Sequence, residues 1–511
     1  MNRPSKPAAS QRRTAIAAAA AAAVSAAAAW ALPSAAAIAV AGAVAVILAA
    51  AAVFYGTRLR RGAADMRARE RAAGLLGGLA DRAPSLGAVT FEHRARRVRD
   101  ALHGGFPDTA VVEADRLAKN TALPADERIA LLQEVLAWHR QERETAGDGR
   151  SLEFDVVIVS HFGLPGGNTS ANAAEILAYR DAGLRVGLLH HPVYRWGASA
   201  PISDKIEPLI DGDRVVRIDA HDRAHCSLAV VRLPTVLLKP LEHRPRLTAD
   251  AVAIIANQTP YKFYGSEGPS EAAWDIATVE EHLGDWLGDH TWYGAGPTVI
   301  ETLLRHHGEE VADLKLSTDA WFECIDVDRW TLDAPRTADG TVRIGRHSRD
   351  HKLKWPEDPR TLTQCYPDRA PFEIHILGGA EHPRRILGGL PENWVEHEFN
   401  SMDSREFLSR IDVLVYFISS EGKEAFGRAP LEAMAAGVPV VMDRVFEPTF
   451  GPAALYCTPE DVAATAAALV ADPQAYRDQR DRALEYVRHH FSEQALIRRI
   501  RTLGVTVPPT A

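Results

Sequence analysis

The stretch EAFGRAPLEAMAAGVPVV, Glu424–Val441, decides the fold of this chain. An apolar run, Asp412–Ile418, comes before it and is typical of a buried strand, which Ser419, Ser420 and Gly422 would end. In doubly wound sheets, ligands bind beyond the carboxyl ends of the strands, where a helix N-terminus offers unpaired N–H groups and a positive dipole end. A strand, a glycine-containing turn and a helix start therefore predict a ligand site here.

Two glutamates in this stretch stand eight residues apart. Glu424 lies on the turn, where it can accept hydrogen bonds from hydroxyls, and Glu432 lies inside the helix, where it can hold a second diol. Gly427 lets the backbone approach a diphosphate, and Pro430 suits the first helical turn because its missing N–H is not needed there. The pattern indicates a cradle for a sugar nucleotide. Taken alone, two glutamates at this spacing are more often solvated side chains.

This segment resembles the Glu-x7-Glu element of retaining glycosyltransferases of family 4, which have the GT-B fold of two facing Rossmann-like domains. The resemblance implies that Glu424 binds the hydroxyls of the transferred sugar and Glu432 the ribose, with Ala425, Phe426 and Gly427 at the donor site. The positions that match the family pattern are Glu424, Phe426, Gly427, Leu431, Glu432, Ala433, Met434, Gly437 and Pro439.

A second matching stretch is FDVVIVSHFGLPGGNTSANAAEILAYRDAGLRVGLLHH, Phe154–His191. It predicts a strand at Phe154–Val159, a loop at Gly163–Asn168 and a helix at Thr169–Ala182. By the resemblance, the Gly166-Gly167 pair brings backbone against the donor phosphate. The G-x-G-x-x-G spacing is absent, so this loop does not match the dinucleotide fingerprint.

A third stretch, VRIGRHSRDHKLKW, opens the C-terminal domain with a strand at Val342–Gly345. Arg346 and Lys352 then match the Arg and Lys that the family aims at the donor diphosphate, and Lys354 competes for the Lys role. A guanidinium and an ammonium suit leaving-group oxygens that gain negative charge as the glycosidic bond breaks. Without the other motifs, basic residues after a strand are more often a solvated loop.

The acceptor side departs from the family pattern, which often has a His after a strand in the middle of the N-terminal domain. The corresponding strand here is Ala251–Ala256, and Asn257 follows it instead. Asn257 and His161, which follows the first strand, are the acceptor-side candidates. The triplet Asp326-Val327-Asp328 falls where the family has a turn before the interdomain linker. This position argues against a metal-binding Asp-x-Asp motif. No metal site is predicted.

Composition agrees with an ordinary globular protein of 511 residues. The length suggests two to four domains at roughly 150 residues each. The net charge of -9 gives no support to nucleic-acid binding, and the four cysteines lie far apart with no C-x-x-C pair, as expected for reduced thiols in the cytosol.

The N-terminus is different, because Ala15–Leu32 and Ser34–Tyr55 are almost uncharged and rich in alanine. About 20 apolar residues span a bilayer, so these segments predict either a transmembrane helical hairpin or one true span beside a low-complexity helix. Arginine and lysine on both flanks favour a hairpin with both ends in the cytoplasm. A cleaved signal peptide is the alternative, but the apolar region is too long for one.

These features divide the chain into five parts: a membrane segment at 1–62, a helical region and linker at 63–150, an acceptor-side GT-B domain at 151–335, a nucleotide-sugar-binding GT-B domain at 336–485, and a C-terminal helix crossing back at 486–511. Helices are predicted at Ala110–Leu117 and Ala125–Trp138, and one long helix at Pro473–Leu503. In the second GT-B domain, the predicted elements alternate along the chain: Phe372–Leu377, Arg405–Arg410, Asp412–Ile418, Leu431–Ala436 and Val438–Met442.

The sequence as a whole predicts a membrane-anchored, retaining glycosyltransferase on the cytoplasmic side of the cell membrane. It would move a sugar from a nucleoside-diphosphate donor, a co-substrate, to a hydroxyl of a glycan, lipid-linked or cell-wall polymer acceptor in envelope polysaccharide biosynthesis, without a cofactor. The alternatives are another GT-B enzyme, such as a sugar-nucleotide epimerase or a phosphorylase, and a catalytically silent membrane scaffold.

Overall fold

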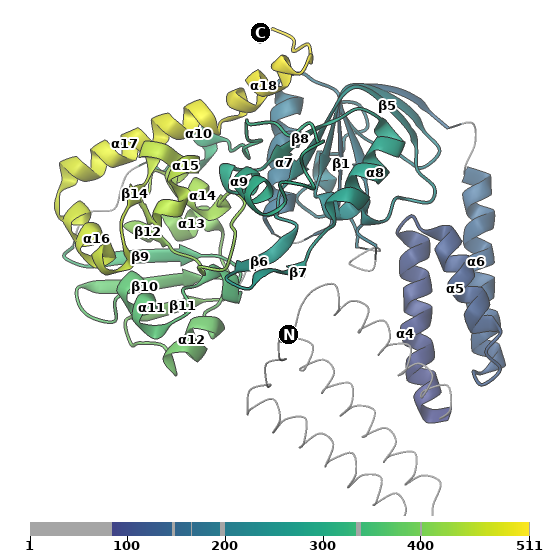
Figure 1. Ribbon diagram of the computed structural model, residues 1–511, viewed down its shortest axis with the longest axis horizontal. Coiled ribbons are helices and arrows are strands. Elements are labelled where there is room, and N and C mark those ends of the chain that lie inside the picture. The colour runs from purple at the N-terminus through teal and green to yellow at the C-terminus, as the bar shows by residue number, and fades with distance from the viewer. Residues whose placement is uncertain are drawn as a thin grey trace, which may run out of the picture. The chain divides into compact units, whose positions relative to one another are not determined.

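The computed structural model describes residues 84–145, 149–164, 166–194, 200–333, 339–398 and 401–509. The predicted membrane segment at 1–62 lies outside these ranges. Within them, none of the helices combines the length and hydrophobicity needed to span a bilayer. The chain divides into two compact units, one containing helices α4 to α6 and the other containing residues 148–269 and 273–511 (Figure 1).

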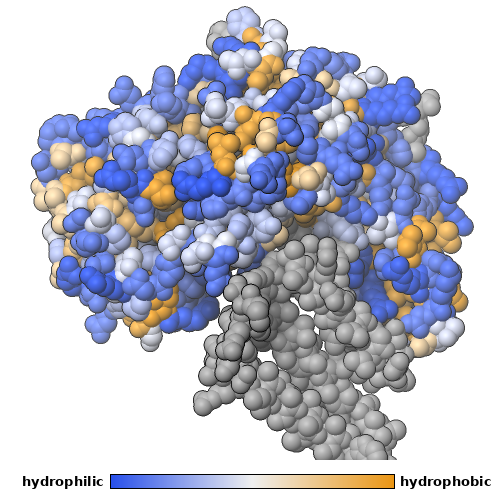
Figure 2. Space-filling model, viewed as in Figure 1, coloured by the Kyte–Doolittle hydropathy of each residue, from blue (hydrophilic) through white to orange (hydrophobic). Residues whose placement is uncertain are grey.

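In residues 84–145, the described part of the first unit, three helices are present where the sequence predicted two: α4 Pro84–His103, α5 Pro107–Ala118 and α6 Ala125–Thr145. The added helix α4 packs on the others through buried Val98 and Leu102, and Arg99 Nε donates to Glu134 Oε2 over 2.9 Å. Large apolar side chains remain exposed on α5 and α6, and Figure 2 shows hydrophobic residues on the surface of this unit. These exposed residues are Val111, Val112, Ile129 and Leu136.

The second unit begins with a parallel six-stranded sheet in the order β3-β2-β1-β4-β5-β8. Its first strand extends the predicted one in both directions, and Val156–Val159 is fully buried, as parallel strands covered on both faces require. The strands of this sheet are β1 Ser151–Ser160, β2 Val186–His190, β3 Val215–Arg217, β4 Arg223–Arg232, β5 Arg246–Ala256 and β8 Thr291–Gly294. The chain also forms a separate two-stranded pair, β6 Tyr261–Gly265 and β7 Gly268–Ala272.

A second parallel sheet of six strands follows, in the order β11-β10-β9-β12-β13-β14. Both sheets thus repeat the doubly wound order in which the first strand lies beside the second and the fourth. The predicted α/β fold with parallel sheets is confirmed. The strands are β9 Val342–His347, β10 Phe372–Leu377, β11 Trp394–His397, β12 Val413–Tyr416, β13 Val440–Met442 and β14 Leu455–Tyr456.

Helices connect the strands of both sheets. The α-helices are α7 Gly167–Asp181, α8 Ile276–Leu287, α9 Pro297–His306, α10 Val327–Trp330, α11 Pro359–Cys365, α12 Glu381–Leu387, α13 Ser404–Leu408, α14 Arg428–Ala436, α15 Glu447–Phe450 and α16 Val462–Ala471. Short 3-10 turns lie at η1 Glu207–Leu209, η2 Pro234–Leu238, η3 Lys352–Lys354, η4 Arg444–Phe446, η5 Gly451–Ala453 and η6 Pro459–Asp461.

The predicted single helix at the end of the chain is wrong, because the structure has two, α17 Pro473–His490 and α18 Glu493–Thr502. Ser492 adopts an extended conformation between them, and its hydroxyl caps α18 by accepting from Ala495 N over 3.2 Å. Figure 1 shows α17 over the second sheet and α18 at the first. Leu496 and Ile500 of α18 join the core around β1, so the chain returns to the first sheet.

A fully buried ion pair lies inside the first domain. Arg232, at the end of β4, donates through Nη2 and Nε to the two carboxylate oxygens of Glu175 on α7, over 2.5 and 3.2 Å. Trp321 Nε1 donates to the same carboxylate over 3.1 Å. Since a buried charge is tolerated only when it is paired and hydrogen-bonded, these contacts tie the helix, the strand and the segment that leaves the domain to one another.

Arg232→Met would leave the Glu175 carboxylate without its counter-ion. We expect the free energy of unfolding to fall by about 3–5 kcal/mol, because removing one partner of a buried pair leaves the other charge buried without compensation. A urea titration followed by tryptophan fluorescence measures this. Arg305→Met is the control, since Arg305 forms an exposed pair with Glu301 on α9 and its loss should change little. Equal midpoints for the two variants would contradict the role of the buried pair.

Candidate active site

The turn that bears Glu424 joins β12 to α14. Gly427 caps this helix in a left-handed conformation, with φ of 106°, which a residue with a side chain rarely adopts. Helix α14 begins three residues before the predicted start at Leu431, and Pro430 stands in its first turn. Phe426 is buried against the rings of Phe450 and Phe491, so it anchors the turn in the core.

Glu424 is paired with a lysine. Its Oε2 contacts Lys354 Nζ and accepts from the Tyr416 hydroxyl over 3.2 Å. Burial alone would raise the pKa of Glu424, but the Lys354 charge and these two hydrogen bonds outweigh burial and hold that pKa below its ordinary value. Burial would lower the pKa of Lys354, yet the Glu424 charge raises it overall. Both groups are therefore charged at neutral pH.

Arg346 is fully buried and contacts Lys354 and Tyr416, which both touch Glu424. It donates to the Tyr366 hydroxyl over 3.1 Å and to the carbonyl oxygens of Phe417, over 3.0 Å, and Lys354. Its guanidinium carbon also lies 4.2 Å from the ring centre of Tyr416. These contacts hold the backbone of Lys354 beside the end of β12.

The two candidate lysines have separate environments. Lys352 lies in η3 with Nζ 4.1 Å from the ring centre of Phe263, whereas Lys354 contacts Glu424. The structure therefore brings Lys354, the competing candidate, to the carboxylate and does not bring Lys352 there. Spacing alone does not separate residues 352 and 354, because the direction of each side chain depends on the short 3-10 turn.

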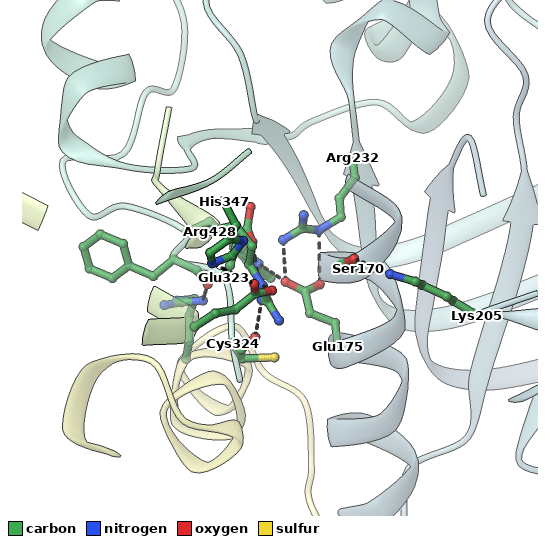
Figure 3. Close-up of polar contacts among 12 residues, drawn as sticks. Ser170, Glu175, Lys205, Arg232, Glu323, Cys324, His347 and Arg428 are labelled. Atoms are coloured by element: carbon green, nitrogen blue, oxygen red, sulfur yellow. Dashed lines mark hydrogen bonds and ion pairs between the residues drawn. The ribbon is translucent and has the colours of Figure 1, made fainter. Parts of the chain in front are cut away.

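Glu432 belongs to a second charged group, of which only Glu432 was predicted from the sequence. Its Oε1 accepts from Arg428 Nε over 3.0 Å, and its Oε2 lies 3.8 Å from His347 Nε2. Arg428 also reaches Glu323 and the carbonyl of Cys324, on the segment between the two sheets (Figure 3). The i,i+4 spacing of Arg428 and Glu432 on one helix was the available signal for this pair.

The candidates of the first domain lie at the carboxyl ends of its sheet: Gly166 and Gly167, predicted at the donor phosphate, and Asn257 and His161, predicted on the acceptor side. Gly166 caps α7 with φ of 104°, and Gly167 is the first residue of that helix. Asn257, after β5, donates from Nδ2 to Asn168 Oδ1 over 3.0 Å, so it lies beside the glycine turn. His161 is buried, and its Nδ1 accepts from Gly163 N over 3.1 Å.

Close contacts bring the two halves of the site together. A Cβ atom at Gly296, after β8, would lie 2.3 Å from the carbonyl oxygen of Ala425, so only glycine fits there. A Cβ atom at Gly166 would lie 3.7 Å from the side chain of Arg349, which follows β9. Turns at the carboxyl ends of the two sheets therefore lie against each other, and these turns carry candidate residues of both domains.

Residues 359–471 match the family described as glycosyl transferases group 1. The matched range contains Glu424 and Glu432 and lies entirely within the second domain. The match supports the class of glycosyltransferases. No curated protein matches the chain.

Solved glycosyltransferase structures are similar at low sequence identity. A glycosyltransferase from Rickettsia africae is 12% identical, with a TM-score of 0.45, and the match covers 70% of this chain and 98% of that one. An alpha-glucosyltransferase in complex with UDP and a DNA 13-mer is 10% identical, with a TM-score of 0.46 and coverage of 69% and 99%. A mutant of TarM from S. aureus, in complex with UDP among other ligands, is 13% identical at a TM-score of 0.39; the match covers 59% of this chain and 57% of TarM.

Gly296→Ala would force the Ala425 carbonyl away from the β8 turn. We expect the free energy of unfolding to fall by about 1–3 kcal/mol, the usual result of inserting a methyl group into a filled space. Thermal unfolding of the full chain measures the change. Gly284→Ala is the control, because a Cβ atom at that helical position meets nothing within 4 Å. A Gly296→Ala protein as stable as the Gly284→Ala protein would show that the two turns do not touch.

Proposed function

We propose that this chain transfers a sugar, with retention, from a nucleoside-diphosphate donor to a hydroxyl acceptor. The observation that carries the proposal is the partly buried Glu424–Lys354 pair, whose glutamate lies on the turn before α14. The Gly166-Gly167 turn of the other domain lies near Arg349, which follows β9. The group 1 match across the same turn supports it. A charged pair beside a helix N-terminus suits a substrate with sugar hydroxyls and a diphosphate.

The donor's parts divide among the residues of the second domain. Glu424, ionised because its pKa is depressed, accepts hydrogen bonds from the hydroxyls of the transferred sugar. Lys354 and the N-terminal N–H groups of α14 stabilise the negative charge that grows on the diphosphate as the glycosidic bond breaks. Arg346 holds Lys354 in place through its backbone carbonyl. In this proposal Glu432 binds the ribose and no metal takes part.

The acceptor occupies the first domain in the same proposal. Asn257 and His161 lie at the ends of β5 and β1, beside the glycine turn, where an acceptor hydroxyl would approach the sugar. The apolar segments within residues 1–62 motivate a membrane anchor, and with it an acceptor close to the membrane, such as a lipid-linked glycan or a cell-wall polymer precursor.

Glu424→Gln keeps the size of the side chain and removes its charge. We expect the transfer rate to fall on the order of 100-fold, the scale of losing one electrostatic contact to the reacting group. The assay uses the labelled donor selected by a thermal-shift screen of the full chain against UDP-, GDP-, ADP- and TDP-sugars. Glu447→Gln, at an exposed pair on α15, is the control. Full activity in Glu424→Gln, or no stabilisation by any donor, would overturn the proposal.

The structure favours Lys354 over Lys352 as the diphosphate contact. We expect Lys354→Met to raise the Kd for the nucleoside diphosphate by about tenfold or more, because it removes a charge-assisted contact, and Lys352→Met to raise it less. Isothermal titration calorimetry compares the two. A larger loss of affinity in Lys352→Met would assign the diphosphate contact to Lys352, the lysine that matches the family pattern.

A further inference from the structure

A series of charges of alternating sign, three of them buried and two partly buried, runs from the first domain to the second. It passes from Glu175 on α7 to Arg232 at the end of β4, then to Glu323 on the segment between the sheets, and to Arg428 and Glu432 on α14. Figure 3 labels the first four of these residues. Arg232 also acts electrostatically on Glu323, which links the two groups of contacts. The series therefore ends at the carboxylate that we assign to the ribose.

Arg428 is the first residue of α14 and the first member of this series in the second domain. Its Nε donates to Glu432 Oε1 over 3.0 Å, while its Nη1 donates to the Cys324 carbonyl over 2.9 Å and lies 3.5 Å from Glu323 Oε2. The side chains of Arg428, Glu323 and Glu432 keep 16%, 12% and 11% of their exposure, so water competes little with these contacts. One planar guanidinium thus joins the helix of the candidate donor site to the segment between the domains.

The geometry leaves one oxygen of Glu432 for a ligand. Arg428 occupies Oε1, whereas Oε2 lies 3.8 Å from His347 Nε2, beyond hydrogen-bond distance. Burial lowers the pKa of His347, against the opposing charge of Glu432, so this ring is neutral at pH 7. A carboxylate held through one oxygen has a defined direction for the lone pairs of the other, which a freely rotating side chain lacks.

We propose that Arg428 is a positioning residue, which holds Glu432 in the orientation that binds the ribose hydroxyls of the donor and couples that orientation to the segment between the domains. The inference rests on the proposed role of Glu432 in donor binding. Loss of Arg428 should weaken recognition of the ribose hydroxyls but leave the contacts to the diphosphate in place. A purely structural role for Arg428 would not separate these two parts of the ligand.

The test measures nucleotide binding to the full chain by calorimetry, with UDP, GDP and ADP and the 2′,3′-dideoxy form of each. For the base that binds best, we expect the wild type to prefer the ribonucleotide by about tenfold or more, the scale of hydrogen bonds to a charged group. In Arg428→Gln the preference should fall to about twofold or less, because only the ribonucleotide loses affinity. Glu323→Gln should reduce the preference in the same direction, whereas Arg444→Gln, at an exposed pair, should keep it.

The outcomes separate the inference from the proposed function. If the wild type binds a ribonucleotide and its dideoxy form equally, or binds none of them, the donor role of Glu432 fails and the inference with it. If the wild type discriminates and Arg428→Gln discriminates equally well, the inference alone is overturned. If Arg428→Gln does not fold, Arg428→Lys replaces it, because an ammonium keeps the charge but cannot contact Glu432 and the segment between the domains at once. An undiminished preference of Arg428→Lys for the ribonucleotide would also overturn the inference.

Discussion

The burial of the Arg346 guanidinium is the constraint on which the second domain's site depends. A fully buried cation is stable only if its surroundings supply acceptors, and here they are the hydroxyl of Tyr366 and the carbonyls of Phe417 and Lys354. These acceptors come from separate parts of the chain, so satisfying one side chain brings the loop after β9 to the end of β12. The Lys354–Glu424 pair follows from that meeting.

The two domains are joined by polar contacts as well as by the chain itself. Arg428 of α14 binds the segment that leaves the first domain, and the break at Ser492 lets α18 pack on the first sheet. At this break, Phe491 N donates to the Val487 carbonyl, and the Phe491 carbonyl accepts from Ile325 N, each over 2.8 Å. The contacts of Arg428 and of Phe491 both end on residues 321–325. A change in the alignment of the two domains must therefore act on the same segment that Arg428 contacts.

Parts of the fold could be predicted because buried parallel strands carry an unmistakable pattern. Phe372–Leu377 coincides with β10, and the predicted Asp412–Ile418 contains β12, since both are short runs of apolar residues bounded by turns. The helix pattern at Pro473–Leu503 was misleading, because α17 and α18 share the same periodicity and only the cap at Ser492 separates them. Similarly, Lys352 and Lys354 lie two residues apart in a short irregular segment. No periodicity of the sequence there predicts which of the two side chains faces Glu424.

The sequence alone determined the class of fold and the turn on which the candidate site is built, because apolar runs, glycines and helix starts are local properties of the chain. It also singled out Glu424, Glu432 and the Gly166-Gly167 turn. Only the tertiary structure decided that Lys354 is the partner of Glu424, that Arg346 holds the backbone of Lys354 and that Arg428 joins Glu432 to the other domain. Those choices depend on which charges meet inside a low-dielectric interior, where each must find a counter-ion or a hydrogen bond from a distant part of the chain.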